Sequence, residues 1–264
     1  MEPAISFVTA DAGGRTTVSF VYKNQTSTDV TVDVAAADVR RRSGEHAGVT
    51  FAPIGEGERG AGAWLRVDAP TFDLAAGTER TIRIGIDVPT AAGAGGHYGG
   101  LTFTAHPQRP AGQVDLGARV EVPVLITVPG DARRAVDLTI EPDDRVRWSG
   151  GELAWRVRAH NAGDLHENLT GAVVSIDGAL TPAQSRPLDL GILLPGETRT
   201  RTVHLSVREA PDLLRATVRA PRDAGADPVT GTAAPVAIVP WWSLAVLVIA
   251  SIVVRRRLRR RGGQ

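Results

Sequence analysis

Two short stretches, Thr16-Thr-Val-Ser-Phe-Val-Tyr22 and Val30-Thr-Val-Asp-Val34, decide the fold class. In both, apolar and polar residues alternate, and in an extended chain every second side chain points to the same side. Such a period of two is typical of a β-strand that buries one face. We therefore predict a strand at each stretch, with one face on a hydrophobic core.

The same alternation continues along most of the chain. Further strands are predicted at Ala63–Val67, Thr81–Val88, Leu101–Thr104 and Val120–Val128, and residues rich in Asn, Gly, Pro and Asp separate them. No window before residue 233 has a helical period over three turns. Parallel βαβ units need helices between their strands, so the pattern predicts antiparallel sheets and an all-β fold.

A second series of strands follows the segment Pro129-Gly-Asp-Ala-Arg-Arg134, which interrupts the alternation. Leu153–Asn161 resembles Val18–Asn24, because each is an alternating strand that ends in Asn. The turn glycines Gly77 and Gly196 likewise precede similar alternating strands. The offsets of the two pairs differ, so the halves share an architecture with different loop lengths and are not a tight repeat.

These patterns predict two tandem immunoglobulin-like β-sandwiches, at residues 1–129 and 135–220. Residues 221–234 are rich in Pro, Gly, Ala and Asp, and we expect them to form a flexible stalk.

The C-terminal region has the composition of a membrane segment. Residues 235–254 carry no charge, and at 1.5 Å per residue a helix of that length covers about 30 Å, the thickness of the hydrocarbon core. Indole rings favour the headgroup level, and cytoplasmic flanks are rich in Arg. We expect a single transmembrane helix with Trp241 and Trp242 at one interface, Arg255, Arg256 and Arg257 at the other, and a cytoplasmic basic tail at 255–264. The alternative is a buried helix of a soluble domain.

The charge distribution supports this orientation. The net charge is +1, but six arginines lie between residues 255 and 261, which leaves −5 for residues 1–254. A nucleic-acid-binding protein would carry positive charge on its folded part, so we predict no nucleic-acid partner. By the positive-inside rule the bulk of the chain is extracellular, which predicts a single-pass protein of the plasma membrane.

The residues give little sign of catalysis. The chain has no Cys, which excludes disulfides, thiol catalysis and Cys-ligated metals. It has no Gly-x-Ser-x-Gly motif, no phosphate-binding loop and no His-Glu-x-x-His site. His160 and His166 lie near Asp164 and Glu167, but without a regular ligand spacing, and we interpret them as a polar loop. Asp143-Asp144 is interpreted as a solvated turn. We predict no enzyme activity, no cofactor and no metal site.

The most unusual stretch is Ala94-Gly-Gly-His-Tyr-Gly-Gly-Leu-Thr-Phe103. Glycines allow close backbone approach, and a Tyr ring beside a His suits contact with a sugar or a peptide. We therefore predict ligand binding at His97, Tyr98, Gly99 and Gly100. The alternative is a structural role, as a hairpin entry or a β-bulge before the next strand.

The order of these features is similar to that of the WxL-interacting protein family of Gram-positive bacteria. The resemblance rests on the strand ending in Asn24, the segment Leu74-Ala-Ala-Gly-Thr78, the pair Val88-Pro89 and the stretch Gly96–Phe103, and with the second sandwich and the basic tail it covers nearly the whole chain. The resemblance implies a first domain that binds peptidoglycan and a second domain that holds a WxL-type surface protein.

From the residues and the resemblance together we expect a non-catalytic, membrane-anchored cell-surface protein that binds peptidoglycan, a surface protein partner, or both. The alternative is a structural spacer, or an accessory subunit of a membrane complex that does not bind the wall.

Overall fold

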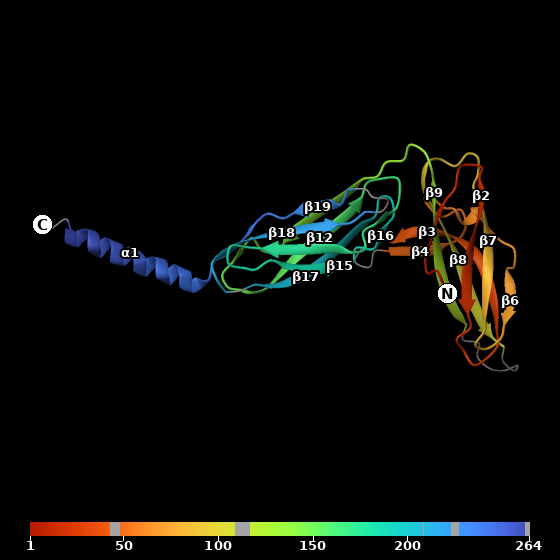
Figure 1. Cartoon of the computed structure of the whole chain (residues 1–264), viewed down its shortest axis with the longest axis horizontal. Helices are drawn as coiled ribbons and strands as arrows, with labels where there is room; N and C mark the ends of the chain where they lie inside the picture. Colours follow the sequence, from red (N-terminus) through yellow and green to blue (C-terminus); the bar gives the residue numbers. More distant parts are fainter. Residues whose placement is uncertain (43–47, 109–116, 208, 223–226, 262–264) are drawn as a thin grey trace. The chain divides into compact units, whose positions relative to one another are not determined.

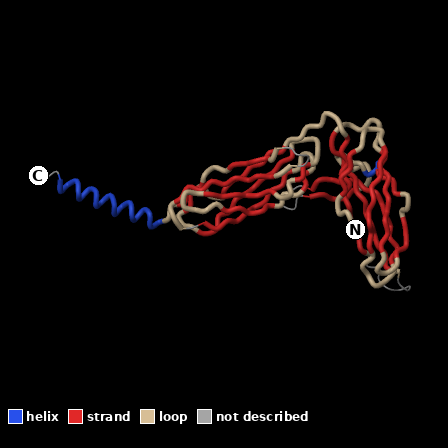
Figure 2. Tube along the Cα trace, in the orientation of Figure 1, coloured by secondary structure: helices blue, strands red, loops and turns tan. Residues whose placement is uncertain are grey.

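The computed structural model describes residues 1–42, 48–108, 117–207, 209–222 and 227–261, and for residues 257–261 it describes the backbone only. Strands make up most of the structure, and one long helix, α1 (Trp241–Arg261), lies at the C-terminal end (Figures 1 and 2). The all-β fold predicted from the alternation is confirmed. The chain divides into two compact units. The first contains residues 1–135 with 162–166 and 194–197, and the second contains 136–161, 167–193 and 198–264.

Two sheets form the first unit. One has the order β1-β9-β8-β3-β4, and β6 also pairs with β3, at a different part of that strand from β4. The other has the order β2-β7-β5. Their bounds are β1 Ser6–Thr9, β2 Arg15–Lys23, β3 Val30–Arg42, β4 Gly48–Ala52, β5 Leu65–Val67, β6 Thr71–Leu74, β7 Glu79–Asp87, β8 Gly95–Pro107 and β9 Ala118–Val128; a 3₁₀ turn, η1, covers Gly62–Trp64. All pairs are antiparallel except β1 with β9.

The inward residues of both sheets share one core. Phe20 on β2 and Phe103 on β8 are fully buried, and their rings lie 6.4 Å apart. Tyr22 packs against the same Phe103 ring at 5.8 Å. The alternation that begins at Thr16 thus places Val18, Phe20 and Tyr22 on the core side, as a half-buried strand requires.

The second unit repeats this plan and adds a short pair of strands. One sheet has the order β10-β12-β17, a larger one the order β11-β20-β18-β14-β15 with β19 on β18, and β13 pairs with β16. Their bounds are β10 Val136–Pro142, β11 Val146–Arg147, β12 Gly151–Asn161, β13 Glu167–Asn168, β14 Ala172–Asp177, β15 Gln184–Leu188, β16 Ile192–Leu193, β17 Thr198–Val207, β18 Asp212–Ala220, β19 Val229–Thr232 and β20 Val236–Ile238. Trp155 on β12 is fully buried in this core, as its alternation with Leu153 and Val157 predicts.

The structure corrects the prediction of a stalk at 221–234. Residues 229–232 form β19, which pairs antiparallel with β18, and Val229 packs against the core of the second unit. Gly231 lies against the carbonyl of Leu138 so closely that a Cβ atom would overlap it. The pairing with β18 makes the segment part of the sheet. Residues 223–226 of the predicted stalk lie outside the described residues.

The predicted transmembrane helix at 235–254 is also corrected. Val236–Ile238 form β20, which pairs with β11 and β18, and α1 begins only at Trp241, after Pro240. The uncharged part of α1, from Trp241 to Val254, therefore covers about 21 Å, less than the roughly 30 Å of a bilayer core. Within the part of the chain that the structure describes, no helix combines the length and the apolar character needed to cross a membrane.

Candidate functional site

The glycine-rich stretch predicted to bind a ligand lies inside β8, in the middle of its sheet. Gly99 and Gly100 are buried, and Gly100 faces the ring of Phe51, where a Cβ atom would overlap the ring. A Cβ atom on Gly96 would overlap the Tyr98 hydroxyl. These glycines thus make room for neighbouring groups, a structural role that differs from the hairpin entry or bulge considered from the sequence. The predicted hairpin entry or bulge is replaced by a continuous strand, Gly95–Pro107.

Most backbone hydrogen-bonding groups of this stretch are already paired within the protein. β8 pairs with β9 over residues 95–105 and with β3 over residues 99–107. Where β3 does not reach, the Gly96 amide donates to the carbonyl of Asp164 at 2.8 Å, and the Tyr98 amide donates to the carbonyl of Arg59 at 2.8 Å. A ligand at this position must therefore be held by side chains.

His97 is occupied by contacts within its own unit. Its Nε2 atom lies 2.9 Å from the carbonyl oxygen of Gly93, and its ring centroid lies 4.5 Å from that of Trp64. Trp64 is only partly buried, at the edge of the core. This arrangement fixes the His97 ring without burying it.

Tyr98 differs from its neighbours, because it is 4% exposed and its hydroxyl has no hydrogen-bond partner of normal geometry among the described residues. Burial raises the pKa of this phenol; the nearby Arg59 charge and the backbone of His166 oppose the rise only in part. The ring also packs edge-on against the His166 ring, with centroids 6.2 Å apart. The phenol therefore stays protonated, with a donor and an acceptor to offer.

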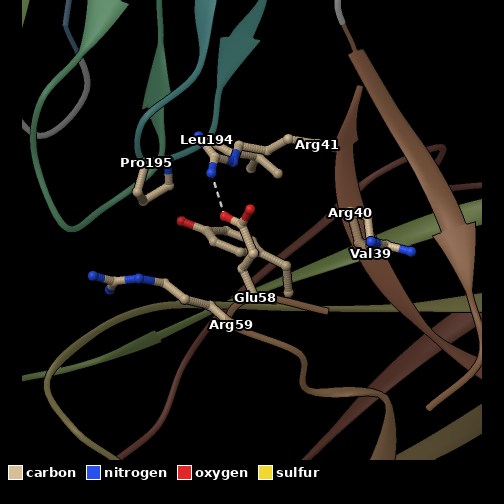
Figure 3. A pocket seen from close by; sticks show the side chains of 8 residues that line it. Val39, Arg40, Arg41, Glu58, Arg59, Leu194 and Pro195 are labelled. Carbon is tan, nitrogen blue, oxygen red and sulfur yellow. Dashed lines mark hydrogen bonds and ion pairs between the residues drawn. The ribbon is translucent and has the colours of Figure 1, made fainter. Parts of the chain in front are cut away.

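Tyr98 lines a cavity of about 240 Å³, here called the Tyr98 cavity. Its other lining residues are Val39, Arg40, Arg41, Glu58, Arg59, Leu194 and Pro195, all of the first unit. Figure 3 shows Arg41 and Glu58 facing each other, with Leu194 and Pro195 beside them and Arg40 directed away. The lining thus combines apolar surface, both signs of charge and a buried hydroxyl, the mixture expected of a site for a polar ligand.

The charges of the Tyr98 cavity are paired. Arg41 forms an ion pair with Glu58, and Arg59 pairs with Asp164 at 3.0 Å. The backbone amide of Arg133 is the main group that holds the pKa of Asp164 below its ordinary value. Burial opposes it as the next largest effect, and hydrogen bonding and charge from Arg59 help to outweigh burial. The cavity is thus close to neutral, which suits a ligand with both donors and acceptors better than a bare anion.

Asp38, which the sequence analysis did not single out, organises the loop that supplies Glu58 and Arg59. Its carboxylate is buried and accepts hydrogen bonds from the amides of Gly55 at 2.7 Å, Gly57 at 3.1 Å and Gly62 at 2.7 Å. A Cβ atom on Gly60 would overlap this carboxylate. The signal was present in the run Gly55-Glu-Gly-Glu-Arg-Gly-Ala-Gly62, whose alternating glycines allow a loop to wrap around one acceptor.

The structure does not gather the other titratable residues considered from the sequence. Nδ1 of His160 lies 2.9 Å from the Thr198 hydroxyl, and Glu167 is buried against Arg222 at 2.7 Å. Over the described ranges, no group of three or more His, Cys, Asp or Glu residues is placed to hold a metal ion. Asp143 and Asp144 are exposed and pair with Arg156 and Arg147 respectively, so they do not form a buried acid pair beside His160.

The residues predicted to lie at a membrane interface are on α1 or at its start. Trp241 and Trp242 are exposed, as are Arg255 and Arg256. The side chain of Arg257 and residues 262–264 of the predicted tail lie outside the described part of the chain.

Comparison with known proteins adds a structural likeness only. No protein-family model and no curated protein matches the chain. Among solved structures, the YadV chaperone is 12% identical with a TM-score of 0.46, covering 88% of this chain and 96% of its own. The class 5 fimbriae chaperone CfaA is 9% identical with a TM-score of 0.47, and the match covers 89% of this chain and 98% of CfaA. The Escherichia coli chaperone DraB is 11% identical with a TM-score of 0.44, and the match covers 88% of this chain and 94% of DraB. A likeness at this level shows neither a shared partner nor a shared mechanism.

Proposed function

We propose that the protein is a non-catalytic binding protein of the bacterial cell surface, whose first unit takes a group of peptidoglycan into the Tyr98 cavity. The proposal extends the resemblance to the WxL-interacting family, which implies a peptidoglycan-binding first domain. The observation that carries it is the buried hydroxyl of Tyr98, a residue that lines the cavity; this hydroxyl has no hydrogen-bond partner of normal geometry among the described residues. Buried polar groups are nearly always hydrogen-bonded, and a bound ligand would supply the missing bond.

The lining favours a small polar group. Drug-sized ligands occupy pockets of roughly 300–1,000 Å³, so a cavity of about 240 Å³ suits one sugar ring or one amino-acid residue. Peptidoglycan offers N-acetyl sugars and short peptides that carry carboxylates and amides. These groups match the paired charges of Arg41 with Glu58, and their methyl groups match Val39, Leu194 and Pro195.

The test is co-sedimentation of the full chain, kept dispersed in mild detergent, with insoluble peptidoglycan. We expect saturable pelleting, and we expect Tyr98→Phe to weaken it about five- to tenfold, as for the loss of one hydrogen bond. Thermal unfolding of this variant should change little, because the removed hydroxyl has no hydrogen-bond partner of normal geometry among the described residues.

Tyr22→Phe is the matched control. Tyr22 is the other tyrosine of the chain, is also buried, and packs against Phe72 and Phe103, outside the lining of the Tyr98 cavity. Its variant should pellet like the unmodified chain. Equal loss in both variants would contradict a site at Tyr98. No pelleting of the unmodified chain would refute wall binding and favour the spacer or accessory-subunit role.

A surface protein partner has a separate place to bind. Strand β2 pairs with β7 along its whole length, whereas among the described residues its other edge is met only by Glu2, which exchanges two backbone hydrogen bonds with Val21. An extended segment of a partner could add to the open part, Arg15–Ser19, by backbone pairing. Thr17→Pro should abolish such pairing, because proline lacks the amide hydrogen, and binding measured by pulldown of surface proteins would decide it.

We further propose that α1 attaches the protein to a membrane, with the two folded units outside the cell. Its apolar side chains between Leu244 and Val254 are exposed, and Arg255 and Arg256 follow them. Apolar surface of this extent favours lipid, and arginines favour anionic headgroups. Flotation of the full chain with vesicles tests the attachment.

A further inference from the structure

A row of exposed apolar side chains crosses three strands of the second unit. Val146 on β11 and Leu213 on β18 are both cross-strand partners of Ala237 on β20, so the three side chains lie on one face of the sheet. Val146 is 50% and Leu213 52% exposed, whereas Leu214 and Val236, which point to the opposite face, are buried. The outer face of the sheet is therefore apolar at this end.

Two further residues extend this row. Leu180 is exposed, and its loop is tied to Asp212, whose carboxylate accepts hydrogen bonds from the amides of residues 179, 180 and 181 at 2.8, 3.2 and 2.8 Å. Trp148, 59% exposed, directly follows β11. We call Val146, Trp148, Leu180 and Leu213 the apolar platform.

The apolar platform is continuous with the start of α1. The amide of Val239 donates to the carbonyl of Arg147 at 2.7 Å, and the amide of Trp241 donates to the carbonyl of Trp148 at 3.2 Å. These bonds fix the first residue of the helix beside the platform. Three exposed tryptophans, at positions 148, 241 and 242, therefore lie at this junction.

Two arginines lie beside the apolar platform, and Asp177 on β14 is the cross-strand partner of one of them, Arg215. Arg145 precedes Val146, and Arg215 lies on the same strand face as Leu213, two residues further along β18. Neither arginine forms an ion pair with any described residue, whereas the nearby Asp143 and Asp144 are paired with arginines. The Asp212 carboxylate is likewise occupied by backbone amides.

We propose that the apolar platform contacts the headgroup region of an anionic lipid membrane, so that the second unit itself, and not α1 alone, binds the membrane surface. This inference rests on the membrane attachment proposed above. Indole rings suit the boundary between lipid and water, and free arginines suit anionic headgroups. Lipid also fits α1, because residues 246–249 are all exposed and, at 100° per residue, they face every side of the helix. A single protein face could not cover them all.

The absence of cysteine from the chain allows a direct test in the full-length protein. One nitroxide label is placed at a time through Leu213→Cys, Leu180→Cys or Val146→Cys. Leu247→Cys reports on α1, and Ile54→Cys, an equally exposed apolar position of the first unit, is the control. On addition of phosphatidylglycerol–phosphatidylcholine vesicles, we expect the platform labels and the label at position 247 to gain collisions with oxygen and to lose collisions with a water-soluble nickel complex. The label at position 54 should not change.

The outcomes separate the two proposals. If the label at position 247 enters lipid while the platform labels stay as water-exposed as the control, the platform inference is wrong and membrane attachment stands. If the label at position 247 also stays in water, membrane attachment itself fails. Protection of the platform labels without vesicles, rising with protein concentration, would show a second copy of the chain as the occupant and would overturn the lipid inference.

A second measurement uses unlabelled variants. The double substitution Trp148→Ser with Leu213→Asn should lower vesicle partitioning about tenfold or more, since two large apolar side chains no longer leave water. Ile54→Asn should leave partitioning unchanged. Equal partitioning of the double variant and the unmodified chain, with folding verified by circular dichroism, would contradict a contribution of the platform.

Discussion

The two halves of the chain contain the same corner, and comparing the two copies shows how one of them became part of a site. In the first unit the amide group of Asn24 donates to the carbonyls of Leu74 and Ala75, both at 3.2 Å, just before the turn at Gly77. In the second half the amide group of Asn161 donates to the carbonyl of Leu193 at 2.9 Å, three residues before Gly196. Each Asn is buried at the end of a strand and ties that strand to the turn that starts the pairing strand.

The two turns differ in what surrounds them. Both glycines adopt a left-handed conformation, with φ of 71° at Gly77 and 72° at Gly196. A Cβ atom on Gly77 would meet nothing within 4 Å, whereas one on Gly196 would overlap the guanidinium group of Arg41. No other group thus packs against the Cα atom of Gly77, where a Cβ atom would find open space. The turn at Gly196, in contrast, brings Leu194 and Pro195 to the lining of the Tyr98 cavity. The same local structure serves folding alone in one copy and also shapes the candidate site in the other.

The largest expected effect comes from the asparagines. Asn24→Ala and Asn161→Ala should each lower the free energy of unfolding of their own unit by about 2–3 kcal/mol, because buried carbonyl groups lose their donors. Since two units need not unfold in one step, hydrogen exchange followed separately on peptides of each unit is the suitable measurement. Asn→Asp at the same positions also removes the amide donor and should cost nearly as much. A variant that destabilises both units equally would contradict two independent corners.

The glycines give a smaller effect that separates the two turns. Gly77→Ala and Gly196→Ala should each cost about 1–2 kcal/mol, because an L-residue with a side chain is strained in the left-handed region. Only Gly196→Ala should also weaken peptidoglycan co-sedimentation, since its Cβ atom displaces the Arg41 guanidinium from the Tyr98 cavity. If Gly77→Ala impaired binding to the same extent, the effect would be one of folding and the distinction between the turns would fail.

The smallest effect is a pH dependence of two loops, one in each unit. Burial raises the pKa of Asp212, but hydrogen bonds from Thr181, Leu213, Leu180 and Ala179 outweigh it and hold the pKa below the ordinary value. The carboxylate therefore stabilises the fold above its unfolded pKa of about 3.9, and this contribution disappears as the pH falls through the lower, folded value. In the first unit the pKa of Asp164 is also held below its ordinary value, mainly by the Arg133 amide, so its contribution to stability is likewise lost as the pH falls.

Relative to its intrinsic rate at each pH, amide exchange of residues 179–181 should consequently speed up below about pH 4 in the unmodified chain. In Asp212→Asn it should be fast already at neutral pH. Asp164→Asn should act in the same direction on the Arg133 amide, and more weakly, because this carboxylate accepts one backbone hydrogen bond instead of several. If loop exchange in Asp212→Asn, taken relative to its intrinsic rate, still changed near pH 4, the dependence would belong to another group.

Local patterns predicted the strands that alternate cleanly and missed those that do not. Phe20 and Trp155 lie in the cores that their alternation indicates. Residues 94–100 and 229–238 were assigned to a loop or bulge, a stalk and a membrane span, yet they contribute to β8, β19 and β20. Glycine-rich or short segments become strands because neighbouring strands supply the hydrogen bonds, and that information is not local in the sequence.

Of the residues that line the candidate site, only Tyr98 was predicted from the sequence. Tyr98 lines the cavity, whereas His97 contacts Gly93 and Trp64, and Gly99 and Gly100 provide space in the sheet. Arg41, Glu58 and Arg59 were not singled out, because nothing in their local sequence distinguishes them from surface charges. Asp38 brings two of them into place from a distance of about twenty residues in the chain.

The sequence by itself determined the all-β class, the two series of strands, the paired Asn and Gly signals, and an apolar C-terminal segment followed by arginines. Period-two alternation and turn chemistry act over a few residues, so they can be seen in the chain directly. Only the tertiary structure decided that 236–238 join a sheet, that Leu194 and Pro195 line a cavity with Tyr98, and that Val146 and Leu213 form one exposed row. These features depend on strand register and on contacts between residues far apart in the chain, where a shift of one residue would turn each side chain to the other face.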